Sequence, residues 1–169
     1  GDDYYNRVLG IDADLKFTPK DRLQFQVLNT NTQYPDSIQI NYDQPKKDFW
    51  GKAYRTFYSH HTKDYEVYVR HDEIEKDFRA DLGFMSRADY KYTELAGIYR
   101  WRRDPGYWYT SISVYNSYDY IRDMSGNLIH RAVTQRWNYE GPLNSHAHTY
   151  VEIGKDRYDG KEFSKNWGD

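Results

Sequence analysis

Two aspartates, Asp12 and Asp14, stand one residue apart in a segment that alternates between polar and apolar side chains. On a β-strand they lie on the same face, because residues two apart point the same way. Such a pair could serve acid–base chemistry or bind calcium. Glycoside hydrolysis needs two carboxyl groups about 5 to 9.5 Å apart across a cleft, and strand neighbours meet that distance without making a cleft. The simpler interpretation is that both aspartates face water, so the catalytic residues are unknown and glycan hydrolysis is the third-ranked hypothesis.

Two histidines, His146 and His148, show the same spacing. They could hold a divalent metal only if a neighbouring element supplied a third ligand, and the sequence identifies none. His60 and His61 are adjacent and point to opposite faces of a strand, so they do not form a pair. The pattern favours polar lining or surface for His146 and His148, and it predicts neither a metal nor another cofactor.

Composition excludes several further classes. The sequence has no Gly-x-Ser-x-Gly motif, no His-Glu-x-x-His motif, no glycine-rich phosphate loop and no dinucleotide fingerprint. Cysteine is absent, which rules out disulfides, thiolate ligands and a cysteine nucleophile. The 24 basic and 26 acidic side chains are interspersed, so nucleic acid is not an expected partner. No apolar stretch is long enough for a membrane helix, and no signal peptide is recognisable.

The elements that position these residues are long strands. In residues 4–17, Leu9, Ile11 and Leu15 alternate with polar residues that include both aspartates, and residues 107–122 repeat the pattern. We predict an all-β, antiparallel up-and-down meander that forms one domain over residues 1–169. About eight strands are expected, at residues 4–17, 22–29, 49–59, 65–70, 89–102, 107–122, 128–139 and 146–153, followed by a polar tail.

The predicted connections alternate in length. Short turns at residues 18–21 and 60–64 alternate with long connections at 30–48 and 71–88, and the hairpin around 123–127 is expected to be tall. Membrane β-barrels place short turns on one side and longer loops on the other. With 169 residues over eight strands, the spacing is about 21 residues per strand, above the ~8 to 12 expected for a soluble sandwich. The chain is therefore interpreted as a β-barrel or as part of a larger one.

Two features favour a soluble β-domain instead. Charged residues make up 30% of the chain, and Arg131 and Gln135 share strand parity with Val133 and Trp137. A charge at mid-depth on a lipid-facing surface costs about 2 to 4 kcal/mol, so a membrane barrel needs Arg131 near a rim. In the membrane interpretation, the interior is lined by Asp12, Asp14, Gln24, Gln26, Ser111, Ser113 and Glu152.

Two segments, residues 6–14 (NRVLGIDAD) and 77–89 (DFRADLGFMSRAD), resemble a known family. It is the uncharacterised outer-membrane barrel-like domain that usually follows a family-nine-type carbohydrate-binding module. The motif residues are Gly83, Phe84, Arg87 and Asp89. We expect Gly83 to supply a positive φ or close packing and Arg87 to pair with Asp89, the alternative being a surface turn with solvated charges. The resemblance covers most of this chain but only part of the family's length, and the chain lacks a terminal aromatic strand.

The resemblance implies a bacterial outer-membrane location and a link to glycans, and it transfers no catalytic residue. The expected function is structural or transport-related, with membrane lipid as a partner and with glycan and the remainder of a larger chain as further partners. The alternative is a periplasmic or secreted β-domain that binds carbohydrate through exposed aromatics. Nineteen tyrosines and five tryptophans would suit sugar stacking, but they also suit cross-strand pairs and the girdles at a membrane interface.

Overall fold

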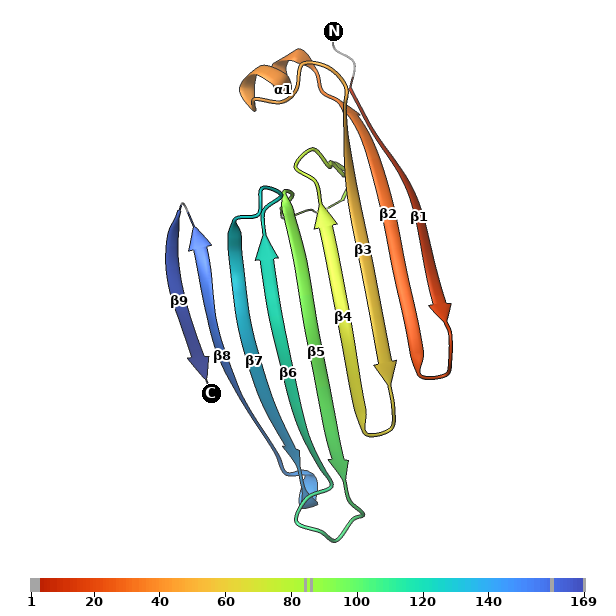
Figure 1. The fold of residues 1–169 in the computed structure, drawn as a ribbon, viewed down its shortest axis with the longest axis vertical. Helices are drawn as coiled ribbons and strands as arrows, with labels where there is room; N and C mark the ends of the chain where they lie inside the picture. The colour runs from red at the N-terminus through yellow and green to blue at the C-terminus, as the bar shows by residue number, and fades with distance from the viewer. Residues whose placement is uncertain (1–3, 84, 86, 159, 169) are drawn as a thin grey trace.

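The computed structural model describes residues 4–83, 85, 87–158 and 160–168. It consists of one open antiparallel sheet in which each strand pairs with the next along the chain, so the predicted all-β meander is confirmed (Figure 1). The strands are β1 Tyr5–Lys16, β2 Asp21–Gln33, β3 Phe49–His61, β4 Tyr65–Ile74, β5 Tyr90–Arg102, β6 Ser111–Arg122, β7 Leu128–Glu140, β8 His146–Tyr158 and β9 Lys161–Gly168.

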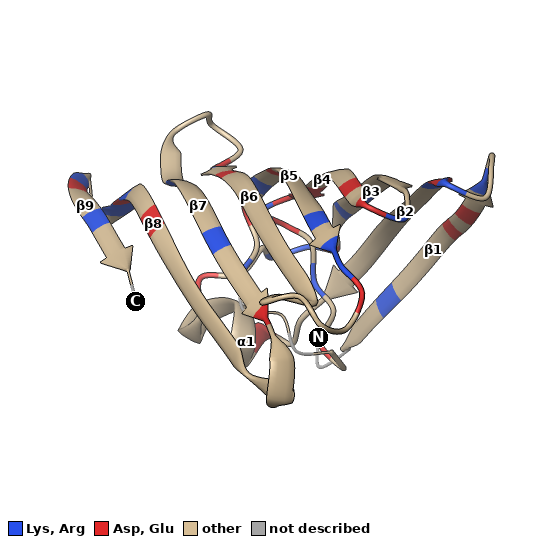
Figure 2. Ribbon diagram, turned by 90° about the horizontal axis from the view of Figure 1, so that it is seen from below, with Lys and Arg blue, Asp and Glu red and all other residues tan. Residues whose placement is uncertain are grey.

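Within the described chain, β1 and β9 do not pair, and they form the two edges of the sheet. Figure 2, which looks along the strands, shows these edge strands on opposite sides. At one end of the sheet, which we call the loop end, lie residues 34–48 with helix α1 Asp36–Asn41 and the loop of residues 75–89 (Figure 1). The opposite end, the turn end, carries the connections at 17–20, 62–64, 103–110 and 141–145.

Three expectations were incomplete. The polar tail continues β8 to Tyr158 and then forms β9, so there are nine strands. β6 begins at Ser111, four residues later than expected, because Tyr107 belongs to the 103–110 connection. The alternation of connection lengths holds for the first four connections only, since the 123–127 connection is shorter than 103–110.

The register separates the sheet into two faces. Cross-strand partners on one face, which we call the apolar face, include Ile11 with Val27, Val69 with Leu95, and Val133 with Ile153. The opposite face, which we call the polar face, carries Asp12, Arg55, Asp72 and Glu94 among others. The two faces follow from the period-two alternation of the sequence, because a one-residue slip would exchange them.

In a soluble sheet protein the apolar face is buried and the polar face is exposed, and here the exposure of the two faces is reversed. Leu9, Ile11 and Ile153 on the apolar face are 77%, 70% and 61% exposed. The polar face is the more buried one, and its fully buried side chains are Thr30 and Thr32. Large aliphatic side chains therefore do not form a core between layers. This agrees with the strongly polar composition of the chain.

The middle of the apolar face, which we call the apolar band, runs across the strands from Leu9 and Ile11 through Val69 and Leu95 to Ile153. It holds no charged side chain among the described residues. Its polar members are neutral, and Gln135 donates a side-chain hydrogen bond of 3.0 Å to Asn116 on the adjacent strand. Arg131, a residue that argued against a membrane sheet, lies near the loop end of β7, where its cross-strand partners are Tyr120 and Lys155. A surface that faces lipid would need both features, namely no charge in its middle and Arg131 near a rim.

Candidate functional site

The seven residues predicted to line an interior all lie on the polar face. Asp14 accepts hydrogen bonds from Arg22 (2.8 and 2.5 Å) and from Gln24 (3.3 Å). At the other edge, Glu152 pairs with Lys165 at 2.8 Å. Register places Asp12 opposite Gln26, Ser111 opposite Glu140, and Ser113 opposite Asn138. The structure thus distributes these residues along the face and does not gather them into one cleft.

A carboxylate shared by two arginines lies on the polar face of β4, two residues from the loop end of that strand. Asp72 accepts two hydrogen bonds from Arg55 (3.0 and 3.2 Å) and two from Arg70 (3.0 and 2.5 Å). The Asp72 side chain is only 4% exposed, whereas that of Arg55 is 55% exposed. One carboxylate therefore holds two guanidinium groups in fixed positions, and one of the two faces open space.

A tyrosine–carboxylate cluster adjoins this triad. The Arg70 guanidinium lies 5.1 Å from the ring centroid of Tyr92. The hydroxyl of Tyr92 is 3.0 Å from Glu94 and 2.7 Å from Asp119, so the two carboxylates share it. Tyr68 also donates to Glu94 at 2.7 Å. The triad and this cluster form a continuous polar network across β3 to β6, with a geometry suited to binding polar solutes through hydroxyls, carboxylates and guanidinium groups.

The loop of residues 75–89 folds over the polar face at the loop end of β1 to β3. Phe78 is buried against Gly51, where an added Cβ would lie 2.2 Å from the Phe78 backbone nitrogen. The Asn6 side chain donates to the Arg79 carbonyl at 3.1 Å and accepts from the Asp81 backbone N–H at 3.3 Å. Gly51 therefore allows the loop to cross the strand at close range, and Asn6 holds it down.

The same loop is joined to the residues 34–48. Arg79 donates to the side chain of Gln44 at 3.0 Å, and its guanidinium lies 5.4 Å from the ring centroid of Phe49. Tyr34 donates to Asp81 at 3.0 Å. Burial, together with this hydrogen bond to a carboxylate, raises the pKa of Tyr34 to about 12, so the hydroxyl keeps its proton as the donor. The two loops form one assembly over the polar face.

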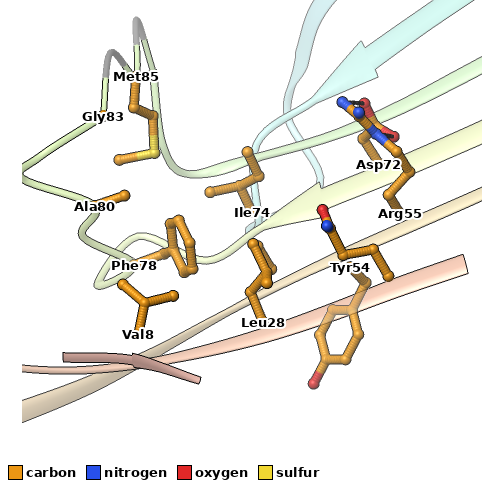
Figure 3. A pocket seen from close by; sticks show the side chains of 12 residues that line it. Val8, Leu28, Tyr54, Arg55, Asp72, Ile74, Phe78, Ala80, Gly83 and Met85 are labelled. Atoms are coloured by element: carbon orange, nitrogen blue, oxygen red, sulfur yellow. Dashed lines mark hydrogen bonds and ion pairs between the residues drawn. The ribbon is translucent and has the colours of Figure 1, made fainter. Parts of the chain in front are cut away.

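Figure 3 shows the cavity beneath this assembly. Its wall is mainly apolar, from Val8 and Leu28 on the strands and Phe78 and Met85 on the loop, and the Arg55–Asp72 pair closes one end. Apolar packing fixes the loop on one side of this space while the polar network begins on the other. The loop is thus positioned to narrow any passage that runs along the polar face.

Substituting Gly51 by valine should release this loop. A Cβ at that position collides with the Phe78 backbone, and overpacking of this kind costs about 1 to 3 kcal/mol. We expect trypsin to cleave after Arg79 at least about tenfold faster in the variant, as the open loop becomes more populated. Gly97→Val is the matched control, because a Cβ there meets Val67 at an ordinary 3.4 Å. Equal cleavage of both variants would contradict this account of the loop.

The residues of the family motif do not show the backbone conformation and contacts expected from the sequence. Gly83 does not adopt a positive φ, and an added Cβ would meet nothing closer than 3.5 Å, so neither predicted reason for a glycine holds. Asp89 has φ 64° and accepts a hydrogen bond from the Met124 backbone N–H at 3.4 Å. Arg87 and Asp89, both described, do not form the expected ion pair. Phe84 lies outside the described residues.

The candidate metal residues gain no set of three side-chain ligands among the described residues, although Glu140 is the cross-strand partner of His146. His146 and His148 share the polar face of β8, and His146 approaches the Asn144 carbonyl at 3.4 Å. Within the described residues, no group of three or more histidine or acidic side chains is placed to hold a metal ion. Nor does any described helix combine the length and apolarity needed to cross a bilayer.

Comparison with protein families, with curated proteins and with solved structures found no match for this chain.

Sequence reasoning missed the Arg55–Asp72–Arg70 triad and the covering loop. A signal for the triad was present, since Arg70 and Asp72 stand two residues apart and so share a face. The pairing of Asp72 with Arg55 depends on the register of β3 against β4, and this register cannot be derived from the sequence alone. The loop path depends on Gly51, whose role becomes visible only when Phe78 is placed above it.

Proposed function

We propose that this sheet is part of an outer-membrane β-barrel, with the apolar face against lipid and the polar face towards an aqueous interior. The role is structural or transport-related, and the loop of residues 75–89 narrows the interior. The observation that carries the proposal is the exposed apolar face, which continues across eight strands from Leu9 to Ile153. Monomeric soluble proteins rarely expose a contiguous apolar patch beyond about 600 Å².

The side chains that flank the apolar band support the same orientation. Aromatic residues gather on the apolar face near the turn end, where Tyr99 and Trp101 have ring centroids 4.7 Å apart and Trp137 is exposed. Tyrosine and tryptophan favour the boundary between hydrocarbon and water because their rings are amphipathic. These residues fit an interfacial girdle.

The open edges set a condition on the complete barrel. An unpaired strand edge is not tolerated in hydrocarbon, where backbone groups have no water to bond. Because neighbouring strands alternate in direction, β1 and β9 run the same way. Antiparallel closure therefore needs an odd number of additional strands between them, so a larger chain or another protein would supply these strands.

Purification behaviour tests this proposal. We expect the protein to be monodisperse in detergent and to aggregate when detergent is removed, because the apolar face then meets water. A soluble carbohydrate-binding domain, the alternative from the aromatic composition, would instead be monodisperse in buffer and retain glycans on a panel. Monodisperse protein in detergent-free buffer, without association with phosphatidylcholine vesicles, would overturn the membrane proposal. The link to glycans stays a prediction, and retention of a glycan by the detergent-solubilised protein would support it.

A further inference from the structure

Cations gather on the apolar face at the loop end of the sheet. The register places basic side chains of six strands on the apolar face at the loop end, and we call them the cationic belt: Arg7, Lys52, Lys91, Arg122, Arg131, Lys155 and Arg157. Each lies two or four residues from a member of the apolar band on its own strand, such as Lys155 from Ile153, which is about 7 to 13 Å along the strand. The belt therefore borders the apolar band.

The register sets like charges against each other. Lys91 is the direct cross-strand partner of Arg122, and Arg131 is the direct partner of Lys155. Like charges in directly opposite positions of a sheet destabilise it. Two acidic side chains reduce the repulsion, since Lys91 pairs with Glu73 at 2.9 Å and Lys155 pairs with Glu162. A third carboxylate, Glu75, accepts a hydrogen bond from the Lys52 backbone N–H at 2.9 Å. Seven cations against three carboxylates still leave an excess of positive charge that an external anion would balance.

The opposite border of the apolar band differs. Its apolar-face positions near the turn end hold aromatic residues, among them Tyr99, Trp101 and Tyr139. The loop-end border also carries aromatic side chains on this face, namely Tyr5, Trp50 and Tyr120. The two borders therefore differ in their cations, with an aromatic rim at the turn end and a rim of cations and aromatics at the loop end. This asymmetry is what a bilayer-spanning sheet needs if the leaflet at its loop end is rich in negatively charged headgroups.

We infer that the cationic belt binds the phosphate groups of anionic lipids in the leaflet at the loop end. The inference rests on the proposed function, because it takes the apolar band to lie in hydrocarbon. Exposed guanidinium and ammonium groups donate charge-assisted hydrogen bonds to phosphate oxygens. Arg122 and Arg131 stand on neighbouring strands, and a phosphate between them would relieve their repulsion from Lys91 and Lys155.

Two triple variants of equal charge test the inference. The belt variant replaces Lys52, Arg122 and Arg131 by glutamine. The control variant replaces Arg100, Arg136 and Lys161, which the register places on the polar face away from lipid. Association of the detergent-solubilised protein with vesicles is measured on dilution into pure phosphatidylcholine and into a mixture with one-quarter phosphatidylglycerol. Each basic side chain near an anionic surface contributes about fivefold, so the preference for the anionic vesicles should fall roughly 100-fold in the belt variant and remain in the control.

The outcomes separate this inference from the proposed function. Equal association of the unmodified protein with both vesicles would overturn the cationic belt and leave the lipid-facing band intact. Association with neither vesicle would overturn the proposed function and the belt with it. Equal loss of preference in both triple variants would show an effect of net charge and would also overturn the belt. Competition by free inorganic phosphate at millimolar concentration, with no lipid preference, would assign the site to a soluble anion and contradict the lipid.

Discussion

Replacing Leu95 by arginine is expected to lower the free energy of unfolding by about 2 to 4 kcal/mol in lipid or detergent micelles. Leu95 lies in the middle of the apolar band on β5, between Val69 and Tyr118, and is 56% exposed. A guanidinium at this position would be held in hydrocarbon without a carboxylate partner among its cross-strand neighbours. Urea titration followed by tryptophan fluorescence measures the change.

The matched control places the same arginine on the other face. Gln24 lies on the polar face of β2, with its side chain 3.3 Å from the Asp14 carboxylate. An arginine there gains an acidic neighbour and faces water, so Gln24→Arg should change the unfolding free energy by less than about 1 kcal/mol. A similar penalty for both substitutions would contradict the assignment of lipid to the apolar face.

Replacing Asp72 by asparagine should cost about 3 to 5 kcal/mol of unfolding free energy, since both arginines lose the buried carboxylate that they share and only Arg70 keeps an acidic cross-strand partner, Glu94. The side chain is 4% exposed and receives hydrogen bonds from both Arg55 and Arg70. After substitution the two guanidinium groups repel each other at short range. Urea unfolding in detergent measures the loss.

An exposed pair on the same face provides the comparison. Asp14 and Arg22 form a hydrogen-bonded ion pair, but each side chain is 44% exposed. Water and salt screen such a pair, so Asp14→Asn should leave the urea midpoint of unfolding nearly unchanged. If the two asparagine variants are equally stable, Asp72 does not organise the polar face as described here.

How much of this fold the sequence predicts depends on how strictly each segment alternates. Residues 9–15 alternate over their whole length, and the faces predicted from them, with Ile11 on one and Asp12 on the other, agree with the register. The ninth strand was missed because Lys161, Glu162 and Lys165 place charges on both faces, which removes the period-two signal. β6 was drawn too early because Trp108 and Thr110 continue its parity into a connection.

The candidate site was less predictable than the strands. Strand parity placed Asp14, Gln24 and Ser113 on one face, but parity does not give the distance between residues on different strands. The triad around Asp72 requires the register of β3 with β4, and the tyrosine cluster around Glu94 requires the next two registers as well. The loop over Gly51 has no periodic signal at all. Its path is fixed by tertiary contacts of Phe78 and Asn6.

The central claim is that lipid contacts one face of the sheet and water the other, and a nitroxide scan of β6 tests it most directly. The chain has no cysteine, so single cysteines at positions 112 to 118 can be labelled without background. In lipid bilayers we predict that labels at even positions collide mainly with oxygen, which concentrates in hydrocarbon, and that labels at odd positions collide mainly with a water-soluble nickel complex. Equal access of the nickel complex at both parities would contradict the account.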